Sequence, residues 1–356
     1  MASIGERVLV TGGSGFVATH CILQLLEKGY NVITTVRSLA LVDEVRDSLK
    51  RGGAAEERVK SVDFSAADLS KDDGWDEACK GCTYVLHIAS PFPASAPKHE
   101  NDLIVPARDG ALRVLKSAKG SGTVKRVVMT SSRCQSFAAI GYGHSDDAQK
   151  LFTEEDWTNL ENPAVPVPPY QKSKTIAERA AWDFVTKNAG SIELAVVNPT
   201  LILGPVLSKR YASSVELVSR LINGQIPGCP DLVFGVVDVR DVASLHILAM
   251  TDPKANGQRF LATADGKFLS VHDMALALKN RLGEKAKKVS TRKLPNILLR
   301  ILGFFDPSVR MVLPELSKYK NASNEKAKAT LGWQPRSPED ALVATVQSLE
   351  QLGLVK

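Results

Sequence analysis

Thr11-Gly12-Gly13-Ser14-Gly15-Phe16-Val17-Ala18 joins a short apolar run to a helical pattern. The run before it, residues 7–10, predicts a buried strand, and apolar side chains recur at helical spacing between Cys21 and Leu26. Glycines allow a backbone to approach a dinucleotide pyrophosphate, and the free amides at a helix N-terminus attract its negative charge. The unit therefore predicts a nucleotide site, for which we expect contacts from Gly12, Gly13, Gly15, Phe16 and Val17.

The composition is typical of a globular protein. The chain has 356 residues, of which 44% are hydrophobic and 24% charged, and its net charge is +6. This length suits one large α/β domain, or such a domain with a smaller lobe. The basic residues are spread along the chain without a basic run that contains aromatic residues, so we expect no nucleic-acid partner.

Cysteine use and the chain start predict a reducing, cytoplasmic environment. Five cysteines form no disulfide framework in a chain of this size, and the first predicted strand begins too early for a signal peptide. The Cys79-Lys80-Gly81-Cys82 segment is predicted to end a helix, where no reactive thiolate is expected. The six histidines lack ligand-like spacing, so no metal is predicted. The most apolar window, 294–305, is too short to span a bilayer, and we expect a packed helix without membrane contact.

The first half of the chain alternates between strand and helix patterns. This alternation predicts a Rossmann-type α/β fold, a doubly wound parallel sheet with its ligand at the carboxyl ends of the strands. The predicted strands after the first are 31–36, 59–64, 84–89, 125–131 and 192–197, and the predicted helices are 39–50, 102–118 and 169–188.

The second half is less regular and predicts a smaller substrate-binding cap. Residues 133–168 form a long Pro-rich segment without periodicity, and such loops in compact domains are usually functional. We expect residues 1–203 to form the dinucleotide-binding domain with the catalytic helix. Residues 204–356 would form mainly the cap, with residues 236–262 returning to the first domain.

Tyr170 and Lys174 lie four residues apart on a predicted helix and therefore share one face. A free tyrosine has a pKa of about 10, and a nearby ammonium favours the phenolate, which makes proton transfer easier at neutral pH. A serine at the end of the fifth strand could hold a substrate carbonyl. Ser131 and Ser132 are adjacent on that strand, so only one can face the site, and the spacing leaves the choice open.

The motifs occur in an order that resembles the extended short-chain dehydrogenases/reductases. They are Gly12-x-x-Gly15-x-x-Ala18, Asp68-Leu69, Ala89-Ser90, Thr130-Ser131-Ser132, Tyr170-x-x-x-Lys174, Asn198-Pro199, the 237–243 segment Val-Asp-Val-Arg-Asp-Val-Ala and the 331–335 segment Leu-Gly-Trp-Gln-Pro. The long segment before Tyr170 and the Val-Asp-Val-Arg-Asp motif are similar to the dihydroflavonol-reductase-like branch. That branch includes microbial NADPH-dependent aldehyde and ketone reductases.

The resemblance implies roles for individual residues. Tyr170 would be the general acid, Lys174 would hold the nicotinamide ribose, and Ser132 would bind the carbonyl. Asp68 and Leu69 would flank the adenine, Ala89 and Ser90 would contact the cofactor, and Pro199 and Thr200 would lie against the carboxamide. Asp238 and Asp241 would hold the cap in place without taking part in the chemistry.

Arg37 favours NADPH over NADH. It follows the second predicted strand, where an NAD site would place an acidic residue, and residues 34–38 contain none. An arginine there suits the 2′-phosphate, although Leu39, Ala40 and Leu41 offer no second basic group.

The predicted activity is reduction of a small carbonyl compound, an aldehyde or a ketone, to an alcohol. Phe137, Leu201, Val206 and Phe234 suggest a hydrophobic substrate but could equally be core residues. Two alternatives stay open: an NAD-dependent nucleotide-sugar epimerase or dehydratase, and a non-catalytic NADP-sensing regulator. The sequence is compatible with a monomer or a homodimer.

Overall fold

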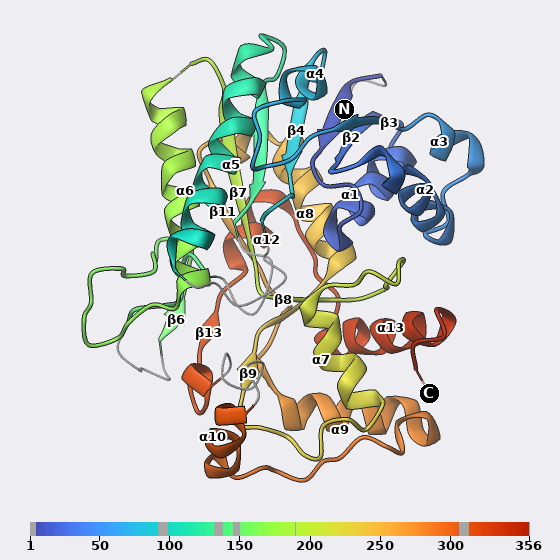
Figure 1. Ribbon diagram of the computed structural model, residues 1–356, viewed down its shortest axis with the longest axis vertical. Helices are drawn as coiled ribbons and strands as arrows, with labels where there is room; N and C mark the ends of the chain where they lie inside the picture. The colour runs from blue at the N-terminus through green and yellow to red at the C-terminus, as the bar shows by residue number, and fades with distance from the viewer. Residues whose placement is uncertain are drawn as a thin grey trace.

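Two layers of helices enclose a seven-stranded parallel sheet (Figure 1). The computed structural model describes residues 5–91, 99–131, 138–144, 150–188, 190–305 and 313–355. The strand order is β11-β7-β5-β4-β1-β2-β3, and all neighbours run parallel. The strands are β1 (Arg7–Val10), β2 (Asn31–Val36), β3 (Asp63–Ala66), β4 (Tyr84–His87), β5 (Arg126–Thr130), β7 (Glu193–Pro199) and β11 (Arg259–Ala262). The predicted doubly wound sheet is confirmed, and its order reverses between β1 and β4, where such folds bind their ligand.

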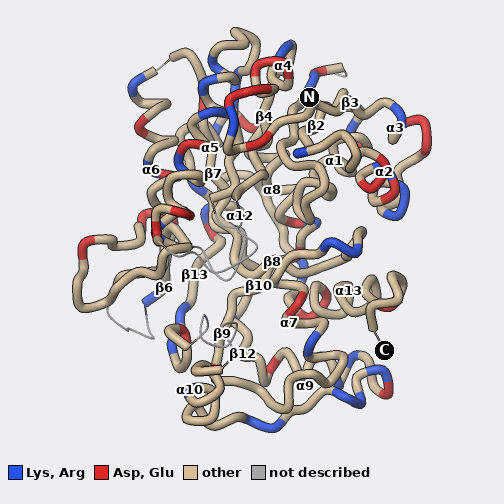
Figure 2. Tube along the Cα trace, in the orientation of Figure 1, with Lys and Arg blue, Asp and Glu red and all other residues tan. Residues whose placement is uncertain are grey.

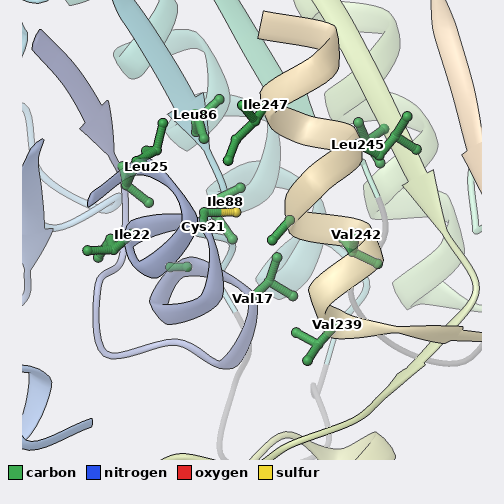
Figure 3. Packing of buried hydrophobic residues seen from close by; sticks show 14 of the residues in the cluster. Val17, Cys21, Ile22, Leu25, Leu86, Ile88, Val239, Val242, Leu245 and Ile247 are labelled. Carbon is green, nitrogen blue, oxygen red and sulfur yellow. The ribbon is translucent and has the colours of Figure 1, made fainter. Parts of the chain in front are cut away.

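One face of the sheet is covered by α1 (Phe16–Glu27), α2 (Val42–Arg51) and α8 (Val239–Thr251). Figure 3 shows α1 and α8 packed side by side, with Val17 of α1 toward Val239 of α8 and Cys21 beside Ile88. This contact places the N-terminal turn of α1, and with it the glycine turn, at the carboxyl edge of the sheet.

The other face is covered by α4 (Trp75–Cys79), α5 (Asn101–Gly120) and α6 (Pro169–Lys187). The longest of these helices, α5 and α6, lie side by side in Figure 1. Proline is favoured in the first turn of a helix, and Pro169 begins α6 as predicted. Cys79 ends α4, as predicted, and burial raises the pKa of its thiol to about 12.

A second apolar core lies below the sheet in Figure 1. Its helices are α7 (Ser213–Ile222), α9 (Val271–Leu282) and α13 (Pro338–Gln351), and α10 (Asn296–Phe305) lies at its lower edge. Paired short strands complete it: β8 (Leu201–Leu203) with β10 (Val236–Asp238), and β9 (Val233–Phe234) with β12 (Leu269–Ser270). The remaining elements are η1 (Leu39–Leu41), α3 (Glu56–Lys60), β6 (Leu151–Phe152), η2 (Pro253–Ala255), η3 (Gly283–Ala286), η4 (Leu313–Glu315), β13 (Asn321–Ala322) and α12 (Glu325–Leu331).

Asp238 caps α8, and Asp241 connects this helix to residues 333–336. Asp238 caps α8 by accepting a hydrogen bond from the Arg240 amide at 2.8 Å. Asp241 accepts a hydrogen bond from the Arg336 amide at 2.6 Å, and its carbonyl accepts one from Trp333 Nε1 at 2.9 Å. The predicted structural role is supported for Asp241, whereas the role of Asp238 in holding the cap stays a prediction.

Two local predictions were wrong. Residues 59–64 do not form one strand: Val59 belongs to α3, and β3 begins only at Asp63. Two glutamates in the first turn of α3 favour a helix there, and Val59 is its buried residue. The apolar window 294–305 contains a helix, α10, but that helix is not packed on all sides, since only Leu299 and Gly303 are buried.

Candidate functional site

The turn between β1 and α1 requires glycine at two positions. Gly12 has a φ of 75°, and a Cβ there would lie 3.0 Å from that of Ala89. A Cβ on Gly13 would lie 2.4 Å from Thr34 Oγ1, closer than real Cβ contacts. The turn is also fixed by the Gly12 amide, which donates to Thr35 Oγ1 at 3.0 Å. Residues with side chains would therefore displace the turn from the sheet.

The N-terminus of α1 is open to an anion. Among the described residues no side chain caps this helix at Gly15. The amides of the first helical turn have no intrahelical acceptor, and together with the helix dipole they attract negative charge. This end of the helix suits a pyrophosphate, as the sequence predicts.

A cavity of about 720 Å³ opens beside this helix end. Its volume lies within the usual range for small-molecule and cofactor sites. It brings together eight of the predicted cofactor residues: Gly12, Gly15, Phe16, Arg37, Asp68, Leu69, Ala89 and Ser90. The segment that leads into α7 closes another side of the cavity with Arg210, Tyr211 and Ser213. No motif in the sequence points to these three residues, because they lie far along the chain from the glycine turn.

Near β2 and β3 the cavity is lined by the cation of Arg37 and by the carboxylate of Asp68, which already accepts hydrogen bonds. Asp68 accepts hydrogen bonds from the amide and the hydroxyl of Ser70, both at 2.8 Å. The Ser70 amide, then its hydroxyl and, more weakly, the charge of Arg37 hold the pKa of Asp68 below its usual range. Arg37 itself is exposed at the rim. A phosphate at this end would therefore meet Arg37 rather than an unengaged carboxylate.

Tyr170 and Lys174 lie on consecutive turns of α6, as the spacing predicts. Tyr170 is half-buried and Lys174 is buried. The Lys174 ammonium lies 5.3 Å from the centroid of the Tyr170 ring and donates a hydrogen bond to Ser90 Oγ. Because Ser90 also lines the cavity, this bond connects the Tyr170–Lys174 pair to the predicted cofactor site.

A neutral histidine lies behind this pair. His87 is buried, and its Nδ1 is 3.0 Å from Thr11 Oγ1, which also accepts a hydrogen bond from the Ala89 amide at 2.9 Å. Burial, together with the charge of Lys174, lowers the pKa of His87 to about 4. The prediction of a satisfied core histidine is confirmed. Its imidazole fixes the end of β4 without adding a second charge beside Lys174.

Of the two serines that could face the substrate, Ser131 and Ser132, the structure describes only Ser131. Ser131 is 0% exposed, and its Oγ has no hydrogen-bond partner among the described residues. A side chain so enclosed is poorly placed to receive a substrate. Ser132 lies outside the described residues, so its assigned role as the carbonyl-binding serine stays a prediction.

Several other predicted contacts are not part of the cavity. Val17 is a core residue, and Thr200 is fully buried with its hydroxyl directed to the Ala262 carbonyl at 3.3 Å. Gly13 and Pro199 also do not line the cavity. The apolar substrate candidates Leu201, Val206 and Phe234 all pack in the cores, and Phe137 lies outside the described residues.

In the parts of the chain that the structure describes, no cluster of His, Cys, Asp or Glu could hold a metal ion. No helix there combines the length and the hydropathy needed to cross a bilayer.

The comparisons with known proteins agree with this geometry. The model of the NAD dependent epimerase/dehydratase family matches residues 8–261. The chain belongs to this family. The predicted resemblance to the extended short-chain dehydrogenases/reductases is thereby confirmed.

Several proteins that are similar to this chain are named as reductases. A putative NADPH-dependent methylglyoxal reductase of Candida albicans, GRP2, is 35% identical over 73% of this chain and 78% of its own length. The ketoreductase azaE of Aspergillus niger is 33% identical over 88% of this chain and 94% of its own. The crystal structure of the yeast methylglyoxal/isovaleraldehyde reductase Gre2 complexed with NADPH has a TM-score of 0.77 at 28% identity, covering 98% of this chain and 100% of that one.

Proposed function

We propose that this protein is an NADPH-dependent carbonyl reductase that converts an aldehyde or a ketone to an alcohol. The observation that carries the proposal is the connection from Tyr170 through Lys174 to Ser90 at the wall of the cavity. It joins a group that can donate a proton to a site that can hold a dinucleotide. The NADPH-dependent reductases among its relatives support the same activity.

The lining of the cavity contains groups suited to separate parts of NADPH. The glycine turn and the first-turn amides of α1 would bind the pyrophosphate, and Asp68 and Leu69 would flank the adenine. Arg37 would pair with the 2′-phosphate, since its guanidinium can donate two parallel hydrogen bonds to a phosphate. When bound, the cofactor supplies the hydride for the carbonyl carbon.

The residues on α6 would handle the proton. Tyr170 would donate its phenolic proton to the carbonyl oxygen, and Ser132 would hold that oxygen by a hydrogen bond. Lys174 would bind the nicotinamide ribose and, as a cation 5.3 Å from the ring, stabilise the phenolate left on Tyr170. Ser90 would orient Lys174 for both tasks.

The class of substrate and the cellular location of the enzyme are also proposals. We propose a small carbonyl compound, which the relatives' names support. Three of the four apolar side chains that suggested a hydrophobic substrate, Leu201, Val206 and Phe234, are core residues, so that preference now has less support. A cytoplasmic location fits the free, buried thiols of Cys21, Cys79, Cys82 and Cys229.

The family also includes epimerases and dehydratases by its name, so the alternative to test is a nucleotide-sugar epimerase or dehydratase that retains NAD. Freshly purified protein should be denatured and the released nucleotide identified. A second, native sample of the same preparation should be assayed for NADPH oxidation with small aldehydes, α-diketones, β-ketoesters and aryl ketones. Turnover of at least one carbonyl with NADPH, without retained NAD, is expected. Stoichiometric NAD and no carbonyl turnover would favour the epimerase.

A further inference from the structure

Helix α10 presents apolar side chains to solvent. Of the eleven large hydrophobic residues that are exposed among the described residues, six lie on this ten-residue helix. Phe304 and Phe305, at its end, are 77% and 81% exposed. Soluble proteins rarely gather exposed apolar surface in one place unless it contacts a partner or a membrane. The six residues are Ile297, Leu298, Ile301, Leu302, Phe304 and Phe305.

The helical geometry shows that these six side chains form one continuous face. At about 100° per residue they span an arc of about 160°. Leu299 and Gly303, the buried residues, lie on the opposite side. Arg300 is exposed and lies between the two sides. The helix therefore packs on the protein through a narrow stripe and directs its wide apolar face outward.

The chain that leads into this helix is strongly basic. From residue 285 to residue 305 it carries six Lys or Arg residues and no Asp or Glu, and all six are exposed. They are Lys285, Lys287, Lys288, Arg292, Lys293 and Arg300. Figure 2 shows basic residues along the lower edge of the molecule, where this segment runs from α9 to α10.

Three acidic groups close to this surface already have partners. Lys285 forms an ion pair with Glu350 at 2.8 Å, and Glu315 pairs with Lys320 at 3.1 Å. Asp231 accepts hydrogen bonds from Ser317 Oγ at 2.6 Å and from the Tyr319 hydroxyl at 2.9 Å. Lys285 is therefore neutralised by Glu350, whereas Glu315 and Asp231 are held by partners outside the basic segment.

We propose that α10 and the preceding basic segment 285–293, the α10 surface, dock on an anionic lipid membrane. The apolar arc with its two terminal phenylalanines would enter the interface, and the cations would lie among the headgroups. A second copy of the chain fits less well, because a symmetric contact through this face would bring two sets of cations together. This contact is peripheral and independent of the proposed reductase activity.

Co-sedimentation of the full chain with lipid vesicles tests the proposal. We expect binding to phosphatidylcholine vesicles that contain phosphatidylserine, and much weaker binding to phosphatidylcholine alone. Added salt should reduce the binding, because it screens exposed charges. Replacing Arg292, Lys293 and Arg300 together by Gln should weaken it about a hundredfold, since each charge near an anionic surface contributes about fivefold. Phe304→Ser with Phe305→Ser should weaken it at least tenfold.

Matched variants on other surfaces provide the control. Lys60, Lys116 and Lys187 are exposed on α3, α5 and α6, and their joint replacement by Gln removes the same total charge. Leu151→Ser removes an exposed apolar side chain from another surface. Both controls should bind vesicles like the wild type, and unchanged thermal unfolding midpoints should show that every variant is folded.

Three results would overturn the proposal. The first is no binding to the phosphatidylserine vesicles. The second is an equal loss of binding in the control with Lys60, Lys116 and Lys187 replaced, which would mean attraction by net charge alone. The third is a stable dimer in solution that dissociates when Phe304 and Phe305 become serine, which would assign the α10 surface to a second copy of the chain.

Discussion

Tyr170 is the residue on which the proposed chemistry depends most directly. Tyr170→Phe removes the proton donor but keeps the ring that lies beside Lys174. Proton transfer by a positioned side chain contributes about 10²–10⁴-fold to a rate, so turnover should fall by that factor. NADPH affinity, measured by fluorescence titration, should stay within about twofold. Near-normal turnover in this variant would mean that another group donates the proton.

Arg37 should determine the preference for NADPH over NADH. Arg37→Gln removes a charge-assisted contact worth about 1.5–3 kcal/mol, so KM for NADPH should rise roughly tenfold to a hundredfold, while KM for NADH stays nearly unchanged. Arg46→Gln, at a half-buried arginine of α2 that does not line the cavity, is the control and should change neither value. Equal losses with both cofactors would place Arg37 away from the 2′-phosphate.

Residues that function through local spacing could be predicted from the sequence. The glycine turn and the Tyr170–Lys174 pair each lie within one short element, and both occur as expected. Contacts between residues far apart in the chain could not be predicted from local spacing. The Lys174–Ser90 bond joins residues 84 positions apart, and Arg210 reaches the cavity from the segment before α7.

At the scale of elements, a buried ion pair fixes the catalytic helix to the sheet. Glu178 of α6 is 0% exposed and accepts a hydrogen bond from Arg259 of β11 at 2.6 Å. It also accepts one from Asn198 of β7 at 2.8 Å. Burying two charges stabilises a protein only while both are paired, and removing one partner leaves the other uncompensated.

Glu178→Ala should therefore lower the free energy of unfolding by about 3–5 kcal/mol, measured by urea denaturation. The exposed pair between Arg220 and Glu216 on α7 is the control, and Arg220→Ala should cost less than about 1 kcal/mol. The double variant Glu178→Ala with Arg259→Met should recover part of the loss. A similar effect of Glu178→Ala and Arg220→Ala would contradict this role of the buried pair.

Elements with strong periodicity were predicted well, and weak ones were not. Helices α5 and α6 begin and end within two residues of expectation. The segment 59–64 failed because three apolar residues in it fit either a strand or a short helix followed by a strand. Apolar content alone also misjudged α10, since it does not tell which side of a helix is covered.

At the scale of the whole molecule, three buried histidines link folding to pH. Burial is the main cause that lowers the pKa values of His20, His87 and His246 to about 4, from 6.5. The unfolded chain therefore binds protons that the folded chain rejects. Their stabilising contribution is complete above pH 6.5 and is lost as the pH falls from 6.5 towards 4.

Denaturation at one pH above 6.5 and at one midway between 6.5 and 4 measures this effect. Each histidine should cost roughly 1–2 kcal/mol at the lower pH. His246 bonds Thr130 Oγ1 at 2.8 Å and the Val242 carbonyl at 2.7 Å, and His246→Gln should make the loss shallower. The same stability at both pH values would show that these imidazoles are protonated in the folded protein.

Hydride transfer to a carbonyl is the central claim, and isotope transfer measures it directly. The protein should be incubated with NADPH carrying deuterium on the transferred position of the nicotinamide and with a carbonyl compound that it turns over. We predict one deuterium on the carbinol carbon of the alcohol, at a rate that falls in Tyr170→Phe. If no carbonyl substrate yields deuterated alcohol, and the protein instead releases retained NAD, the account of this site as a reductase is contradicted.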